Sequence, residues 1–122
     1  MNIYILVGIG GMIGAVMRYG LSIGTALWWN GSFPLATLLA NYIGCFLLPF
    51  SSVKLSGNVS TDVQKAVTTG VIGSFTTFSA FSVETMTLFE SGAAFEAFLY
   101  VFLSITGGMV FVRLGSERRR GQ

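Results

Sequence analysis

The stretch GSFTTFSAFSVET, residues Gly73 to Thr85, places several hydroxyl side chains in the middle of a long apolar segment. Hydroxyl groups at Thr76, Thr77 and Ser79 compete with the backbone for hydrogen bonds and so weaken a helix interior. Irregular backbone at membrane depth persists only where protein or a water-filled cavity satisfies it. We therefore predict a membrane helix that breaks between about residues 73 and 79, beside a polar path.

The composition requires a membrane. The chain has 122 residues, of which 52% are hydrophobic and 10% charged, whereas soluble domains carry about 25% charged residues. So few charges cannot cover a water-facing surface, which excludes a soluble domain. The charges gather in the Lys54–Lys65 connection and in the tail from Arg113 to Arg120. This placement predicts an orienting role in the membrane and no nucleic-acid partner.

Four apolar segments follow one another along the chain, separated by short polar or glycine-containing connections. Each is close to the ~20 residues that a helix needs to cross ~30 Å of hydrocarbon, and none alternates as a barrel strand does. Ser60 or Thr61 suits the start of the third helix, and Gly92 marks a turn after it. We predict one all-α transmembrane domain over residues 1–122, with helices at about 3–27, 34–53, 63–89 and 93–114.

Several kinds of chemistry are missing from this chain. It has no histidine and a single cysteine, Cys45. Intrachain disulfides, imidazole or thiolate metal sites, and Ser–His or Cys–His nucleophile pairs are therefore excluded, and no enzyme is expected. Four helices are also too few to surround a wide aqueous passage, so we expect an oligomer.

Polar side chains recur on three of the predicted helices. Thr37 and Asn41 are four residues apart on the second helix, as are Tyr100 and Ser104 on the fourth, so each pair shares one helix face. The third helix supplies the hydroxyls quoted above. For any one hydroxyl, a bond to the carbonyl one turn earlier is the alternative interpretation. Three helices with such polar tracks favour a path for a polar solute.

The scarcity of charged side chains along these polar tracks indicates which kind of solute they suit. Only Arg18 and Glu84 are ionisable residues deep in a predicted span, whereas a cation pore uses acidic rings or filter carbonyls. The phenylalanines at positions 75, 78 and 81 present rings whose edges are electropositive, although helix packing is their simpler explanation. Neutral donors with ring edges indicate a small anion. Carbonyls freed at a helix break can in turn hold a cation such as sodium.

Three segments carry a family resemblance: GGMIGAVMRY (Gly10–Tyr19), FPLATLLANYIGCF (Phe33–Phe46) and GVIGSFTTFSAFSVET (Gly70–Thr85). With them the chain resembles the Fluc/CrcB family of fluoride channels over essentially its whole length. The resemblance implies passive fluoride export that relieves toxicity, across a prokaryotic inner membrane. It also implies an antiparallel, dual-topology homodimer with two fluoride paths and a structural sodium ion at its centre.

The resemblance also implies roles for individual residues. The backbone carbonyls of Gly73 and Thr76 fall where the family binds sodium, and Arg18 and Glu84 match charged positions without an assigned role. Ser74 stands where the family often has a second glycine, and Pro49 is expected to kink or loosen the second helix. The residues implied to line the pores are Thr37, Asn41, Thr77, Phe78, Phe81, Ser79, Tyr100 and Ser104.

Two other classes of function stay open at this stage. A small proton-coupled multidrug exporter would need a carboxylate in the first helix, and residues 1–27 contain none. A non-transporting membrane scaffold would explain the glycines but not the polar tracks. The basic residues of the 54–65 connection and the tail lie on one predicted side, which favours cytoplasmic termini. That bias conflicts with dual topology, so a heterodimer with an inverted, related chain is the alternative to the homodimer.

Overall fold

The computed structural model describes residues 2–120, and the side chains of residues 2–117. The tail arginines at 118–120, on which part of the orientation argument depends, therefore have side chains outside the described part. Four stretches are long and apolar enough to cross a membrane, as predicted. The helices are α1 (Ile3–Ala26), α2 (Leu35–Leu55), α3 (Thr61–Lys65), the π-helix η1 (Ala66–Ile72), α4 (Gly73–Phe75), α5 (Phe78–Glu90) and α6 (Ala94–Arg120).

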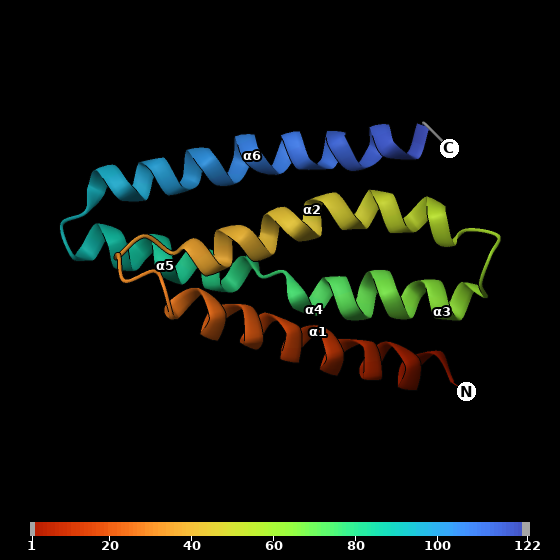
Figure 1. Ribbon diagram of the computed structural model, residues 1–122. Helices are drawn as coiled ribbons and strands as arrows, with labels where there is room; N and C mark the ends of the chain where they lie inside the picture. Colours follow the sequence, from red (N-terminus) through yellow and green to blue (C-terminus); the bar gives the residue numbers. More distant parts are fainter. Residues whose placement is uncertain (1, 121–122) are drawn as a thin grey trace.

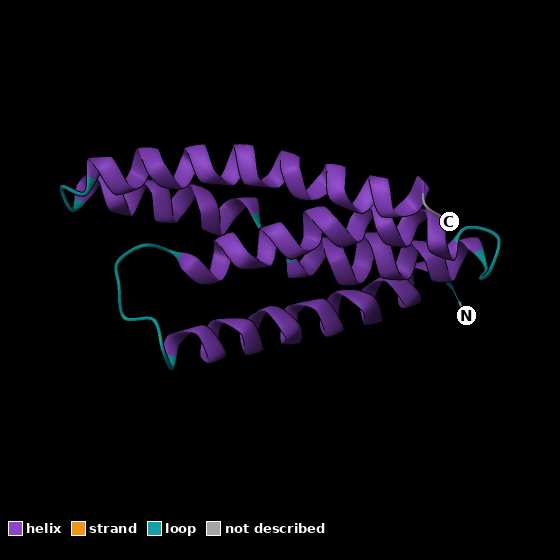
Figure 2. Ribbon diagram, turned by 45° about the horizontal axis from the view of Figure 1, so that its top comes forward, coloured by secondary structure: helices purple, strands orange, loops and turns teal. Residues whose placement is uncertain are grey.

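The helices lie lengthwise beside one another, with both termini and the α2–α3 connection at one end (Figure 1). The α1–α2 and α5–α6 connections lie at the other end, and loops are confined to the two ends apart from the gap in the third span (Figure 2). Helix α2 packs along α6, and α1 packs along η1 and α4. This arrangement places the basic connection on the side of the termini, as the sequence predicts.

Local sequence signals account for the helix ends. The Ser60 hydroxyl accepts the Val63 N–H and caps α3, as predicted. Gly92 takes a positive φ of 86° between α5 and α6, a conformation that favours glycine. Helix α2 continues as one element through Pro49, so the proline does not interrupt it. One expectation needs correction: α6 runs to Arg120 instead of ending near residue 114. The charged tail extends α6 because nothing in it stops a helix.

The third span is broken at the predicted place. Thr76 and Thr77 have extended backbone, with φ and ψ of −85° and 160° and of −156° and 123°. The part before the break packs against α1, and α5 after the break packs against α6. The interruption therefore lets one span change neighbours midway through the bundle.

Backbone-to-backbone contact joins α1 to the first half of the third span. A Cβ added at Gly70 would lie 2.7 Å from the Val7 carbonyl oxygen, and one at Gly10 would collide with Ala66. Small residues of this kind let membrane helices approach closely. The approach occurs along η1, a π-helix that the sequence analysis did not predict. π-helical turns are rare and often lie at functional sites.

The fully buried apolar core is small. Its main cluster is at the end of the bundle opposite the termini and consists of Leu38, Leu88, Ala97 and Tyr100. Outside this cluster, the buried apolar residues of the described chain are Ala40, Ile72 and Phe75. Large apolar side chains elsewhere are exposed, among them Met12, Phe98 and Met109. In a chain of membrane-length helices this surface faces lipid, so apolar exposure carries no penalty there.

Candidate ion pathway at the helix break

The break is held by a side chain from a different helix. The Thr77 N–H donates to Asn41 Oδ1 over 2.9 Å, and Asn41 Nδ2 donates to the Thr77 carbonyl over 3.1 Å. One amide on α2 therefore satisfies both backbone groups of the extended residue. The two residues are 36 positions apart, and the sequence analysis did not foresee this pairing.

Thr77 has a second role as the cap of α5. Its Oγ1 accepts the Ala80 N–H over 3.1 Å and lies 3.1 Å from the Ser79 hydroxyl. This is the usual N-cap arrangement, in which a hydroxyl replaces the missing backbone acceptor. The pattern Thr-x-x-Ala after a break was the available signal for it. The hydroxyls of Thr77 and Ser79 are therefore engaged with each other and with the helix start.

A cavity of about 750 Å³ adjoins the break, between α2, the third span and α6. Its wall joins residues that the sequence analysis placed together: polar groups of α2 and α6, the broken backbone and two phenylalanines. Those lining residues are Asn41, Gly73, Thr76, Thr77, Phe78, Phe81 and Ser104. Apart from Thr37, Ser79 and Tyr100, the structure brings the predicted pore and sodium residues to one hollow.

The three phenylalanines have different surroundings. Phe75 is 6% exposed, so it is a packing residue and does not reach a path. Phe78 is 79% exposed. Its ring centroid lies 5.8 Å from that of Phe81, which in turn lies 5.1 Å from Tyr100. A row of three aromatic rings therefore leads from the open cavity into the core.

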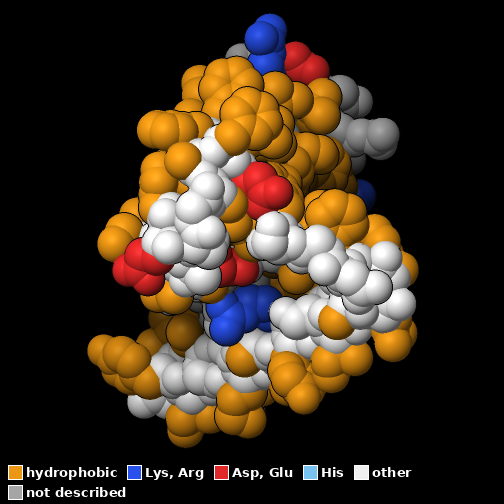
Figure 3. Space-filling model, turned by 90° about the vertical axis from the view of Figure 1, so that its left-hand side faces the viewer, with side chains coloured by type: hydrophobic (Ala, Val, Ile, Leu, Met, Phe, Trp, Pro, Cys, Tyr) orange, Lys and Arg blue, Asp and Glu red, His pale blue; other side chains and the backbone are white. Residues whose placement is uncertain are grey.

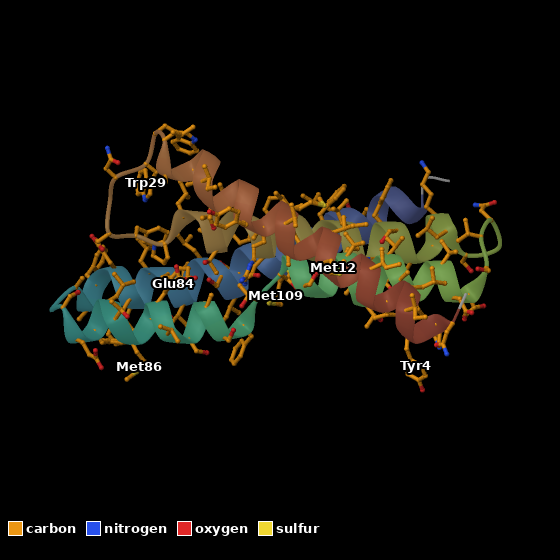
Figure 4. All side chains as sticks on the ribbon, turned by 90° about the horizontal axis from the view of Figure 1, so that it is seen from below. Tyr4, Met12, Trp29, Glu84, Met86 and Met109 are labelled. Atoms are coloured by element: carbon orange, nitrogen blue, oxygen red, sulfur yellow. The ribbon has the colours of Figure 1, made fainter. Side chains whose placement is uncertain are left out.

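Tyr100 lies at the inner end of this row and is fully buried. Its hydroxyl and Glu84 Oε1 are the buried side-chain atoms without a hydrogen bond among the described residues. The Glu84 carboxylate is close to the hydroxyls of Thr37 and Tyr100 and interacts with the charge of Arg18. Figure 4 shows Glu84 within the bundle, whereas Met86 on the same helix points outward. The Tyr100 hydroxyl and the Glu84 carboxylate are therefore neighbours in the bundle interior, although no hydrogen bond of regular geometry joins them.

Arg18 and Thr37 line a second, smaller hollow. It has a volume of about 200 Å³ and lies between α1, α2 and α5. Figure 3 views the bundle from the end that carries the α1–α2 and α5–α6 connections. It shows basic atoms recessed in a hollow, with acidic atoms nearby. The predicted residues thus divide among three places. Arg18 and Thr37 lie at this hollow, and Tyr100 lies in the core with the partly buried Glu84 beside it. The others lie at the break.

These features define a small multi-pass membrane protein whose third span is interrupted and bordered by neutral hydrogen-bonding groups. The chain belongs to the family described as CrcB-like protein, Camphor Resistance (CrcB), whose family model matches residues 5–116. The resemblance stated from the sequence is thereby confirmed.

Individual relatives match over most of their length. The chain is 48% identical over 115 residues to a Bacillus cereus protein named fluoride-specific ion channel FluC 1, covering 93% of this chain and 80% of the relative. A Bacillus thuringiensis protein of the same name is also 48% identical, with 93% and 84% covered. A Listeria monocytogenes protein named fluoride-specific ion channel FluC 2 is 44% identical, with 92% and 86% covered.

Proposed function

We propose that this chain is the subunit of a fluoride-selective channel that lets fluoride leave a bacterial cell passively and so relieves its toxicity. The observation that carries the proposal is the 48% identity, across 93% of the chain, to a protein named for this activity. The four membrane-length spans and the polar cavity at the break support it.

The chemistry of the cavity suits a small anion. Fluoride must exchange its water for other hydrogen-bond donors, and conduction requires that those donors release it again. Ser104 provides a hydroxyl at the cavity wall, and Tyr100 a buried phenol at the end of the aromatic row, beside the Glu84 carboxylate. The rings of Phe78 and Phe81 offer electropositive edges. Donors without formal charge bind an anion without trapping it.

One chain does not enclose such a path. Phe78 is 79% exposed and borders an open cavity, so the rest of the wall must come from another chain. We propose a second copy packed antiparallel against this face. A two-fold axis repeats each wall, and so yields two equivalent pathways. A heterodimer with a related chain is the alternative, which the numbered names FluC 1 and FluC 2 among the relatives suggest.

A structural sodium ion fits the broken helix. Gly73 and Thr76 both line the cavity. Neither carbonyl accepts a hydrogen bond from the amide N–H that an intact helix would supply, because those N–H groups donate to Asn41 and Thr77 side chains. Carbonyls of interrupted membrane helices are suitable sodium ligands. When bound at the dimer centre, the ion would supply positive charge that offsets the field of fluoride nearby.

Reconstitution of the purified protein into fluoride-loaded liposomes tests the proposal. With potassium inside and valinomycin added to carry the compensating charge, a fluoride electrode should record rapid efflux. Chloride-loaded vesicles with a chloride electrode serve as the control and should leak no faster than empty liposomes. A protein that releases no fluoride, or that requires a proton gradient to do so, is not this channel.

A further inference from the structure

We propose that Asn41 is a positioning residue: it keeps the Gly73 carbonyl free for a cation by taking the amide that would otherwise close the helix over it. The inference rests on the proposed sodium site. It concerns how this chain prepares the site, and it assigns Asn41 a task distinct from that of a pore-lining donor.

The hydrogen bonds at the break support this assignment. In an α-helix the N–H of residue i donates to the carbonyl of residue i−4, so in an unbroken helix the Thr77 N–H would donate to the Gly73 carbonyl. It donates instead to Asn41 Oδ1 over 2.9 Å. Among the described residues, no backbone bond joins Thr77 to Gly73. Asn41 Nδ2 also donates to the Thr77 carbonyl, which fixes the residue from both sides.

The second predicted sodium carbonyl is freed in the same manner. An intact helix would pair the Thr76 carbonyl with the Ala80 amide. That amide donates to Thr77 Oγ1 over 3.1 Å, and no bond from Ala80 to Thr76 occurs within the described chain. The two carbonyls expected to hold sodium are thus the two whose amides are taken by side-chain oxygens. Within the described chain, no backbone bond joins Phe78 to Ser74 or Ser79 to Phe75 either. Asn41 and Thr77 therefore occupy the amides of two of the four carbonyls that the break frees.

The weak contacts left to Gly73 agree with this role. The Thr76 hydroxyl lies 3.5 Å from the Gly73 carbonyl oxygen and nearer, at 3.1 Å, to the Ile72 carbonyl oxygen. A hydroxyl has one proton, so the Gly73 oxygen is left with little competition. Both Asn41 and Gly73 line the same cavity, so the side chain that takes the amide and the residue whose carbonyl is freed border one space.

Two substitutions of Asn41 test whether its Oδ1 atom, which accepts the Thr77 N–H, is the part of the side chain that matters. Asn41→Leu removes Oδ1 at nearly constant volume, whereas Asn41→Asp keeps an oxygen that accepts the Thr77 N–H. The measurement is the melting temperature of the purified protein in sodium chloride and in N-methylglucamine chloride. The melting temperature of the wild-type protein should be several degrees higher in sodium chloride, because an ion that binds the folded state stabilises it. Asn41→Asp should keep this gain and Asn41→Leu should lose it.

Asn58→Leu is the matched control. The Asn58 amide donates to the Lys54 carbonyl at the α2–α3 connection, far along the chain from the break. This variant should keep the sodium gain. As a second readout, the ¹³C carbonyl resonance of Gly73 should move on sodium addition in wild type and stay fixed in Asn41→Leu.

The outcomes are distinct. A full sodium gain and a moving Gly73 resonance in Asn41→Leu would overturn the inference. If that variant does not fold, Thr77→Val tests the same principle at the Thr76 carbonyl, and an unchanged sodium gain there overturns it too. If the wild-type protein releases fluoride but its melting temperature does not respond to sodium, the inference about Asn41 is wrong and the proposed channel function is unaffected. If the melting temperature responds to sodium but no fluoride is released, the channel function is wrong and the inference about Asn41 is unaffected.

Discussion

The Ser74 hydroxyl donates to the Gly11 carbonyl over 2.7 Å and so joins the third span to α1 two residues before the break. The Gly70 carbonyl, one turn earlier on its own helix, lies 2.9 Å from the same hydroxyl. Gly14 leaves the room that this contact needs, since a Cβ there would collide with Ser74. Ser74 therefore anchors the first half of the third span where the chain changes neighbours.

Loss of this anchor should destabilise the fold measurably. Ser74→Ala removes an interhelical hydrogen bond, which in membrane proteins contributes about 0.6 kcal/mol and at most about 2. We expect a lower melting temperature in detergent. Ser116→Ala is the control, because Ser116 bonds only to Val112 on its own helix. Equal melting temperatures for Ser74→Ala and the control would mean that the contact with Gly11 is not stabilising.

The glycine contact predicts a sharp contrast between two positions. Gly70→Ala places a methyl group 2.7 Å from the Val7 carbonyl oxygen, so the helices must separate. Overpacking of this kind costs about 1–3 kcal/mol. Gly8→Ala has no atom within 4 Å of the new Cβ and should be neutral. Thermal melts of both variants provide the comparison, and similar losses in both would show that backbone approach is not responsible.

The aromatic row predicts a loss of transport without a loss of assembly. Replacing Phe78 or Phe81 with isoleucine keeps an apolar side chain but removes the ring edge, so fluoride efflux should fall by orders of magnitude. Phe95→Ile is the matched control, since Phe95 is 79% exposed, as Phe78 is. Electrode assays on reconstituted protein measure the flux, and gel filtration checks the dimer. Efflux near wild type in both variants would make the row a packing feature.

Sodium removal should lower activity although sodium itself does not move. If the ion is structural, protein reconstituted in N-methylglucamine salts should conduct less fluoride than protein reconstituted in sodium. Radioactive sodium trapped in the vesicles should stay there while fluoride leaves. Coupled release of sodium with fluoride would instead indicate a transported ion, and no dependence at all would argue against the site at Gly73 and Thr76.

The position of the termini decides between the two kinds of dimer. They share one end of the bundle with the basic α2–α3 connection (Figure 1), which by charge favours the cytoplasm. A tag at the C-terminus, probed from each side of intact cells, should be accessible in a mixed population if the channel is a homodimer. A wholly cytoplasmic tag would point to a heterodimer with an inverted partner chain.

Several features could be predicted from the sequence because they depend on local composition. Apolar length sets the four spans, and clustered hydroxyls after Gly73 predict the break that occurs at Thr76 and Thr77. Ser60 and Gly92 carry the capping and turn chemistry that ends helices. Each of these signals acts over a few residues, so no knowledge of the fold is needed to use it.

Other features are decided only by tertiary structure. Thr37 is four residues from Asn41, and Tyr100 is four residues from Ser104, yet Asn41 and Ser104 line the cavity at the break and Thr37 and Tyr100 do not. The π-helix lies where the third span and α1 approach closely, and no local pattern predicts it. Above all, Asn41 reaches Thr77 across 36 residues. A hydrogen bond between separate helices depends on their relative rotation and height, which the packing of the whole bundle sets and no local pattern encodes.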